Sequence, residues 1–160
     1  MTTPRRLTDP ITAFRIGDPS GSYPVFSAEG ARRFPGRWNE AGAEVIYASV
    51  HYSTAMLEKL VHWTGIMPPD QHFIEIMIPA GTCYEVFSTE HHPDWHQASG
   101  ESARRFGRAW YAECRSAVLL VPSVVARMEQ NIVINTAHDD FHRITVGLER
   151  RIWWDARLFD

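Results

Sequence analysis

The stretch GRWNEAGAEVIYASVHYSTAMLEK, Gly36–Lys59, brings together the features on which the fold and the binding chemistry depend. Arg37 lies in a turn bounded by glycines, Tyr47 belongs to a short apolar run, and Glu58 lies on a predicted helix. A guanidinium binds anions, a phenol hydrogen-bonds and packs on rings, and a carboxylate accepts hydrogen bonds. Together these groups could hold a charged ligand that contains a ring.

The pattern of apolar residues on either side of this stretch predicts alternating strands and helices. Strands are expected over 11–16, 44–49, 72–79, 82–87, 117–121, 124–135 and 144–154. Helices are expected over 53–63 and 101–114, with a helical turn at 138–141. We expect Ser49 or Ser53 to cap the first helix, and Trp63 to face the core with the other apolar residues at helical spacing.

Length and composition indicate one globular domain over residues 1–160, with 1–10 as a loose lead-in. We expect an α/β (α+β) fold in which helices flank a mixed sheet. The net charge of −3 gives no overall basic field for nucleic acid. We expect no secretory signal and no membrane span, because no apolar run approaches about 20 residues. Cys83 and Cys114 form no CxxC pair and lie in apparent core elements, so a reduced, cytoplasmic setting is expected.

Metal chemistry is weakly indicated by the eight histidines. The spacings of His91, His92 and His96, and of His138 and His142, occur in zinc sites. However, the chain has no HExxH motif, and a polar loop is a common place for solvated histidines. We therefore expect no metal.

Hydrolase and phosphate-loop motifs are also missing. A triad of Ser123, His138 and Asp139 is conceivable, but the GxSxG turn is absent. There is no GxxxxGK[ST] and no GxGxxG. If the ligand carries phosphates, side chains such as Arg15 and Arg37 must bind them.

Taken together, these positions resemble the RES family, named for Arg, Glu and Ser, whose members are toxins of RES–Xre toxin–antitoxin pairs. The resemblance covers about residues 11–158. Its matching pieces, in family order, are Phe14-Arg15-Ile16, Gly36-Arg37-Trp38-Asn39 with Gly42, Ile46-Tyr47-Ala48-Ser49, Ala55 with Glu58, Val121-Pro122-Ser123, Asn131 through His138, and Asp155-Ala156-Arg157-Leu158. One departure is Thr136, which follows Asn135 where the family tends to have proline.

The resemblance implies an NAD+-consuming enzyme with a split, mixed sheet similar to the ADP-ribosyltransferase core. It also implies an Xre-type antitoxin partner and a possible higher-order assembly with it. Glu58 would be the catalytic carboxylate, Arg15 and Arg37 would hold the phosphates or ribose, and Tyr47 would contact the nicotinamide. Ser123 would orient a ribose or amide group, with Asn135 and His138 as supporting NAD+-binding residues.

The acceptor of ADP-ribose stays open at this point. A protein acceptor makes the enzyme a mono-ADP-ribosyltransferase, phosphate makes it an NAD+ phosphorylase, and water makes it a glycohydrolase. The resemblance favours a protein. A hypothesis of another class is a non-catalytic domain that binds a nucleotide or a partner.

Overall fold

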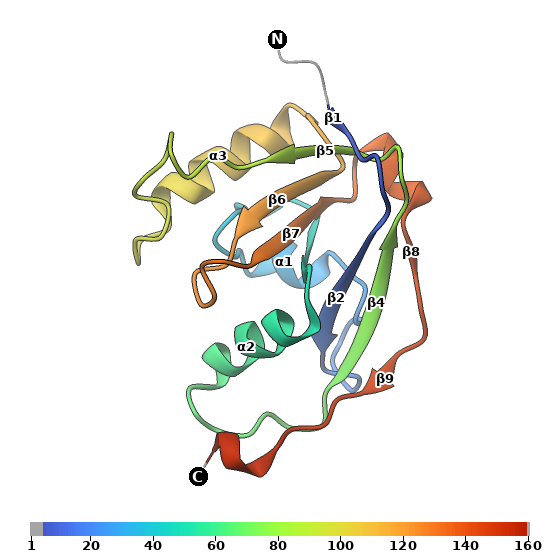
Figure 1. Ribbon diagram of the computed structural model, residues 1–160, viewed down its shortest axis with the longest axis vertical. Coiled ribbons are helices and arrows are strands. Elements are labelled where there is room, and N and C mark those ends of the chain that lie inside the picture. The colour runs from blue at the N-terminus through green and yellow to red at the C-terminus, as the bar shows by residue number, and fades with distance from the viewer. Residues whose placement is uncertain (1–4, 160) are drawn as a thin grey trace.

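The strands pair into one mixed sheet in the computed structural model, which describes residues 5–159 (Figure 1). The strand order is β1-β5-β6-β7-β3-β2-β4-β8, with β9 also pairing with β4. Only β5 and β6 are parallel among the paired strands of the described residues. The strands are β1 Arg5–Arg6, β2 Ile11–Gly17, β3 Val45–Ser49, β4 His72–Ile78, β5 Cys83–Val86, β6 Val118–Pro122, β7 Gln130–Asn135, β8 Thr145–Val146 and β9 Arg150–Arg151.

The sheet is nearly divided between β2 and β3. These strands share a single register pair, Phe14 with Ser49, whereas β2 pairs with β4 from Ile11 to Gly17. The two halves run in different directions, so the sheet curls into a half-barrel (Figure 1). The predicted mixed, split sheet is therefore confirmed.

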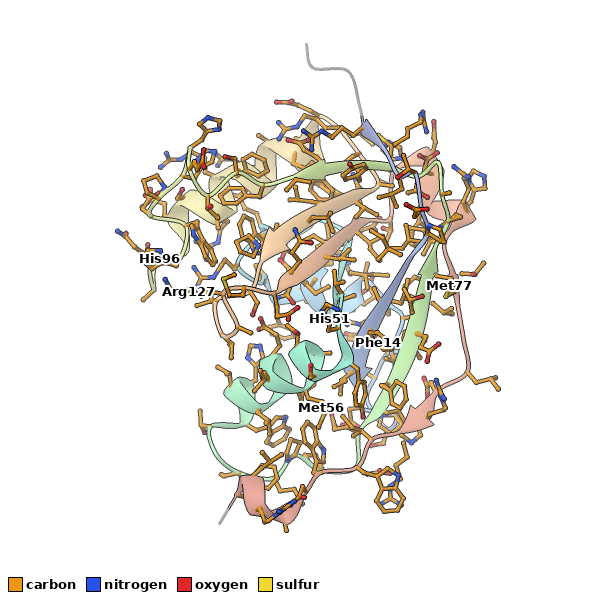
Figure 2. All side chains as sticks on the ribbon, viewed as in Figure 1. Phe14, His51, Met56, Met77, His96 and Arg127 are labelled. Atoms are coloured by element: carbon orange, nitrogen blue, oxygen red, sulfur yellow. The ribbon has the colours of Figure 1, made fainter. Side chains whose placement is uncertain are left out.

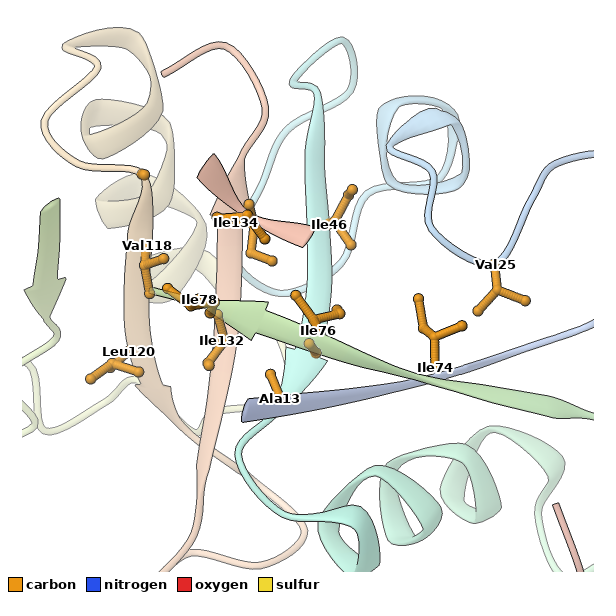
Figure 3. Close-up of a cluster of buried hydrophobic side chains, with 13 residues drawn as sticks. Ala13, Val25, Ile46, Ile74, Ile76, Ile78, Val118, Leu120, Ile132 and Ile134 are labelled. Atoms are coloured by element: carbon orange, nitrogen blue, oxygen red, sulfur yellow. The ribbon is translucent and has the colours of Figure 1, made fainter. Parts of the chain in front are cut away.

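Both faces of the central strands are buried, because β6 and β7 alternate between two apolar clusters. One face carries Val118, Leu120, Ile132 and Ile134, which pack against the isoleucines of β4 (Figure 3). The opposite face packs in a second cluster with three tryptophans and Phe87. Its members from β6 and β7 are Leu119, Val121 and Val133. This is why residues 117–121 form a continuous apolar run.

Three α-helices flank the sheet in the described part of the chain. They are α1 Glu29–Arg33, α2 Tyr52–Trp63 and α3 Glu101–Ala112, accompanied by the 3₁₀ helices η1 Asp139–Arg143 and η2 Ala156–Leu158. Helix α2 packs beside β2 through Phe14 and Met56, while Met77 projects outward from β4 (Figure 2). Within residues 5–159, no helix combines the length and the apolar character that a membrane span needs.

The predicted helices and the turn at 138–141 are confirmed, whereas several details differ. Helix α1 was not predicted, and the strand expected over 124–135 begins only at Gln130. The run 144–154 forms only the two short strands β8 and β9. The differences arise where few side chains are buried. Strands β8 and β9 are exposed, and α1 has no buried residue.

Two expectations about α2 and one about the cysteines were wrong. His51 is the N-cap and makes no side-chain cap, since the Ser49 hydroxyl donates elsewhere and Ser53 lies inside the helix. Trp63 is 38% exposed at the last turn. Cys83 is buried as expected, but Cys114 follows α3 and is exposed.

Candidate active site

A cavity of about 600 Å³ opens where β2 and β3 separate. Its wall comes from β2, the turn that carries GRWN, β3, α2, the loop before α3 and the ends of β6 and β7. This volume is typical of small-molecule sites, which span roughly 300–1,000 Å³. Its charged side chains are Arg15, Arg37, Glu58, Lys59 and Arg104.

The charge in this cavity favours an anionic ligand, because four cations accompany one carboxylate. Lys59 and Arg104 were not predicted as site residues. Lys59 directly follows Glu58 on α2, and Arg104 lies in the first turns of α3. Burial and the positive charge of Arg15 both lower the pKa of Lys59.

Arg15 bridges the two halves of the sheet beyond the pair of Phe14 with Ser49. Its Nη1 donates to the Tyr47 carbonyl at 2.8 Å, and its Nε donates to the Val25 carbonyl at 2.6 Å. A guanidinium thus replaces backbone pairing at the place where the strands separate. Burial lowers the pKa of Arg15 to about 10, which leaves it charged at neutral pH.

Arg37 ties the GRWN turn to the loop before α3. Its Nη1 donates to the carbonyls of Trp95, at 3.1 Å, and Gln97, at 2.8 Å. Gly100 is the N-cap of α3 and has a φ of +64°; a Cβ there would lie 3.6 Å from Arg37 Nη1 and 3.5 Å from Arg104 Nη2. The two guanidiniums therefore lie next to each other at the start of α3.

Tyr47 places its ring on the cavity while its hydroxyl holds the GRWN turn. The hydroxyl donates to Asn39 Oδ1 at 2.6 Å and accepts from the Trp38 amide at 3.1 Å. The Gly36 amide donates to the same Asn39 oxygen at 2.8 Å. Burial raises the pKa of Tyr47. The ring can contact a ligand, but the hydroxyl is already committed to the turn.

Replacing Tyr47 by phenylalanine is therefore expected to cost stability more than turnover. The change leaves the Trp38 amide and the Asn39 oxygen without this partner, which costs about 1–3 kcal/mol in the free energy of unfolding. Urea denaturation measures that loss, and steady-state kinetics on the folded variant measure kcat. A variant with wild-type stability and no activity would instead assign the hydroxyl to the chemistry.

Glu58 is held at one oxygen by two donors. Its Oε1 accepts from Ser123 Oγ and from Asn131 Nδ2, each at 2.7 Å. Ser123 Oγ also accepts from the Ala126 amide at 3.0 Å, and Ser123 is fully buried. Ser123 therefore holds Glu58 through this hydrogen bond and does not line the cavity. Over residues 5–159, no side chain or backbone group hydrogen-bonds Glu58 Oε2, which leaves it available to a ligand.

The structure does not place Asn135 and His138 on this cavity. Asn135 lies at the far end of β7 from Asn131, roughly 13 Å away at about 3.4 Å per residue. Its side chain is fully buried and accepts from the Ala137 amide. His138 caps η1 by accepting from the Asp140 amide at 3.0 Å. A triad of Ser123 with His138 is excluded for the same reason.

Two of the three histidines of the loop before α3 pack on aromatic rings. His92 stacks on Phe87 with centroids 4.9 Å apart, and His96 meets Trp95 edge to face at 5.8 Å. Among the residues that the structure describes, no three or more His, Cys, Asp or Glu side chains form a group that could hold a metal ion.

Comparisons with known proteins cover most of the chain. Residues 12–155 match the family model described as the RES domain. A "Prs ADP-ribosylating toxin" of Sphingobium sp. is 34% identical over 152 residues, covering 91% of this chain and 94% of that protein. A "Toxin Res" of Pseudomonas putida is 31% identical over 142 residues, covering 86% of this chain and 95% of that protein.

A solved structure shares the fold. It is the crystal structure of the M. tuberculosis MbcT–MbcA toxin–antitoxin complex, in which the matching chain superposes with a TM-score of 0.75 at 16% identity. The match covers 92% of this chain and 86% of the other.

Proposed function

The chain belongs to the RES-domain family, and from that premise we propose that it is a toxin that cleaves NAD+ at the nicotinamide–ribose bond. The ADP-ribose is transferred to an acceptor, for which we propose a target protein. One observation carries this proposal: a single carboxylate, held at one oxygen, lies in a cavity whose other charged side chains are all cations.

The chemistry of the bond matches this arrangement of charges. When the ribose–nitrogen bond breaks, its electron pair leaves with nicotinamide, which becomes neutral, and positive charge develops on the ribose. A carboxylate near the ribose stabilises that charge, as carboxylates do in glycoside hydrolysis. Glu58 supplies it through Oε2. The acceptor then attacks the same ribose carbon and loses its proton.

The cations of the cavity bind the diphosphate in this proposal. Arg15 and Lys59 lie on the β2–α2 side, and Arg37 and Arg104 lie at the start of α3. Guanidiniums suit phosphate oxygens because they present planar pairs of donors. The Tyr47 ring offers an apolar surface for the nicotinamide.

Replacing Arg104 by alanine is expected to raise KM for NAD+ by about tenfold with a smaller change in kcat. A charge-assisted hydrogen bond contributes about 1.5–3 kcal/mol, and a tenfold change corresponds to about 1.4 kcal/mol. Arg105 is the matched control: it is the next residue, it is exposed, and it pairs with Glu101 outside the cavity. Equal KM values for the two alanine variants would remove Arg104 from the binding site.

The identity of the acceptor separates three activities that share the first step. NAD+ is incubated with the pure protein alone, with phosphate, and with cell lysate, and the products are followed by mass spectrometry. We expect ADP-ribose on a lysate protein. ADP-ribose 1-phosphate would make the enzyme a phosphorylase, and free ADP-ribose would make it a glycohydrolase. Without nicotinamide release in any arm, the alternative of a non-catalytic binding domain would stand.

We further propose that an Xre-type antitoxin neutralises the chain in the cytoplasm, where NAD+ is available. Support comes from the solved structure of the same fold, which is a toxin–antitoxin complex. Co-expression with the antitoxin should restore growth, and size-exclusion chromatography of the complex measures the assembly. Growth arrest that persists with the antitoxin present would argue against this partnership.

A further inference from the structure

We propose that Asn131 is a positioning residue for Glu58, and that Ser49 holds Asn131 in the orientation this requires. The inference rests on the proposed function, in which Glu58 stabilises the ribose cation. Neither Asn131 nor Ser49 needs to touch NAD+ for this role, although both border the cavity.

Three side chains form a hydrogen-bonded series that ends on Glu58. Ser49 Oγ donates to Asn131 Oδ1 at 2.7 Å, and Asn131 Nδ2 donates to Glu58 Oε1 at 2.7 Å. Ser49 and Asn131 are register partners on β3 and β7, so their side chains project to the same face of the sheet. An ionised carboxylate only accepts, which requires the amide nitrogen to face Glu58 and the amide oxygen to face the serine.

Hydrogen bonds from two side chains also fix the orientation of the Glu58 carboxylate. Asn131 on β7 pairs with Val121 on β6, and Ser123 lies two residues after Val121, directly after the end of β6. One donor from β7 and one from the residue after β6 therefore converge on Oε1 of a helix residue. Two fixed donors on one oxygen restrict rotation of the carboxylate and direct Oε2 toward the cavity.

The hydrogen-bonded series begins at the point where the sheet is nearly divided. Ser49 is also the β3 residue that pairs with Phe14, the single register pair between β2 and β3. Ser49, which holds Asn131 in place, therefore lies where the two halves of the sheet meet. Because Arg15 follows Phe14 directly, the carboxylate and the bridging arginine are positioned from the same junction.

The decisive variant is Asn131→Asp, which places a second carboxyl group against Glu58 Oε1. Two carboxyl groups in contact share a proton, and that proton is released at higher pH than from one group alone. Glu58 must be ionised to stabilise a cation, so activity is lost as pH falls. We expect the acid limb of the kcat profile for nicotinamide release to move up by about one pH unit or more.

Gln130→Glu is the matched control, because it adds the same charge one residue away, on an exposed position that faces the other side of β7. Its acid limb should coincide with that of the wild-type protein. Ser49→Ala adds no charge and removes only the hydrogen bond from Ser49 to Asn131. We expect it to lower kcat about 3- to 10-fold, with little change in KM for NAD+.

A carboxyl-carbon NMR titration of Glu58 in the resting protein gives a readout that needs no turnover. An upward shift of its titration in Asn131→Asp, and none in Gln130→Glu, supports the role. Wild-type kcat profiles in both Asn131→Asp and Ser49→Ala would overturn it while leaving NAD+ cleavage intact. If Asn131→Asp does not fold, an unchanged kcat in Ser49→Ala overturns it. Absence of nicotinamide release by the wild-type protein would refute the proposed function instead.

Discussion

Replacing Glu58 by glutamine is expected to lower nicotinamide release from NAD+ by about 100-fold or more, because loss of one electrostatic partner of a transition state has effects of this size. The amide oxygen can still accept from Ser123 and Asn131 at the position of Oε1. The amide group would then face the developing ribose cation with a donor where the carboxylate carried negative charge. The fold should be kept, since the side chain retains its size and both hydrogen bonds.

Rates of nicotinamide release, measured with the purified variant, test this expectation, and thermal unfolding verifies that it folds. Glu90→Gln is the control, since Glu90 is an exposed glutamate in the loop after β5. In cells, Glu58→Gln should relieve growth inhibition and still bind the antitoxin. Activity within a few-fold of the wild type would show that Glu58 is not the catalytic carboxylate.

Gly107→Ala is expected to lower the free energy of unfolding by about 3 kcal/mol or more. A Cβ at this position would lie 1.7 Å from the Trp38 carbonyl oxygen and 2.7 Å from its carbon. Both atoms belong to the backbone, so no side-chain rotation can relieve the clash. Helix α3 would have to move away from the turn that carries Arg37, which would also open the cavity.

Gly30→Ala is the matched control for this substitution. Gly30 is also helical, but a Cβ there would meet no atom within 4 Å. Alanine favours helix over glycine by about 1 kcal/mol, so this variant should be neutral or slightly more stable. Urea denaturation of both variants gives the comparison. Equal midpoints would mean that α3 does not pack on the GRWN turn as described.

The sequence predicted those elements whose apolar residues face a core. The run 117–121 is buried in and beside β6, and α3 buries Ala103 and Trp110, whereas α2 leaves Trp63 exposed. Helix α1 escaped prediction because its residues are polar and none is buried. The end of the chain alternates like a strand, yet β8 and β9 lie exposed beside β4, where little packing extends them.

The candidate site was predicted in part. Arg15, Arg37, Tyr47 and Glu58 meet in one cavity, although they come from four different parts of the fold: β2, the GRWN turn, β3 and α2. Lys59 and Arg104 were missed because a charged residue on a helix usually faces solvent, and only tertiary packing turns these two inward.

The supporting residues were the hardest to assign. Ser123 was expected to touch the ligand; in the structure it is buried and donates to Glu58. Asn131 lay in a matching segment without a role, whereas Asn135 in the same strand was given one. Both asparagines lie on β7, and only the registers of β3 and β6 decide which of them reaches Glu58.

The central claim is that this cavity cleaves NAD+ by means of Glu58. Its most direct test is release of nicotinamide from NAD+ labelled in the nicotinamide ring, with purified wild-type protein beside Glu58→Gln and with lysate supplying an acceptor. We expect steady release by the wild type and about 100-fold less by the variant. No release by the wild type, or equal release by both proteins, would contradict it.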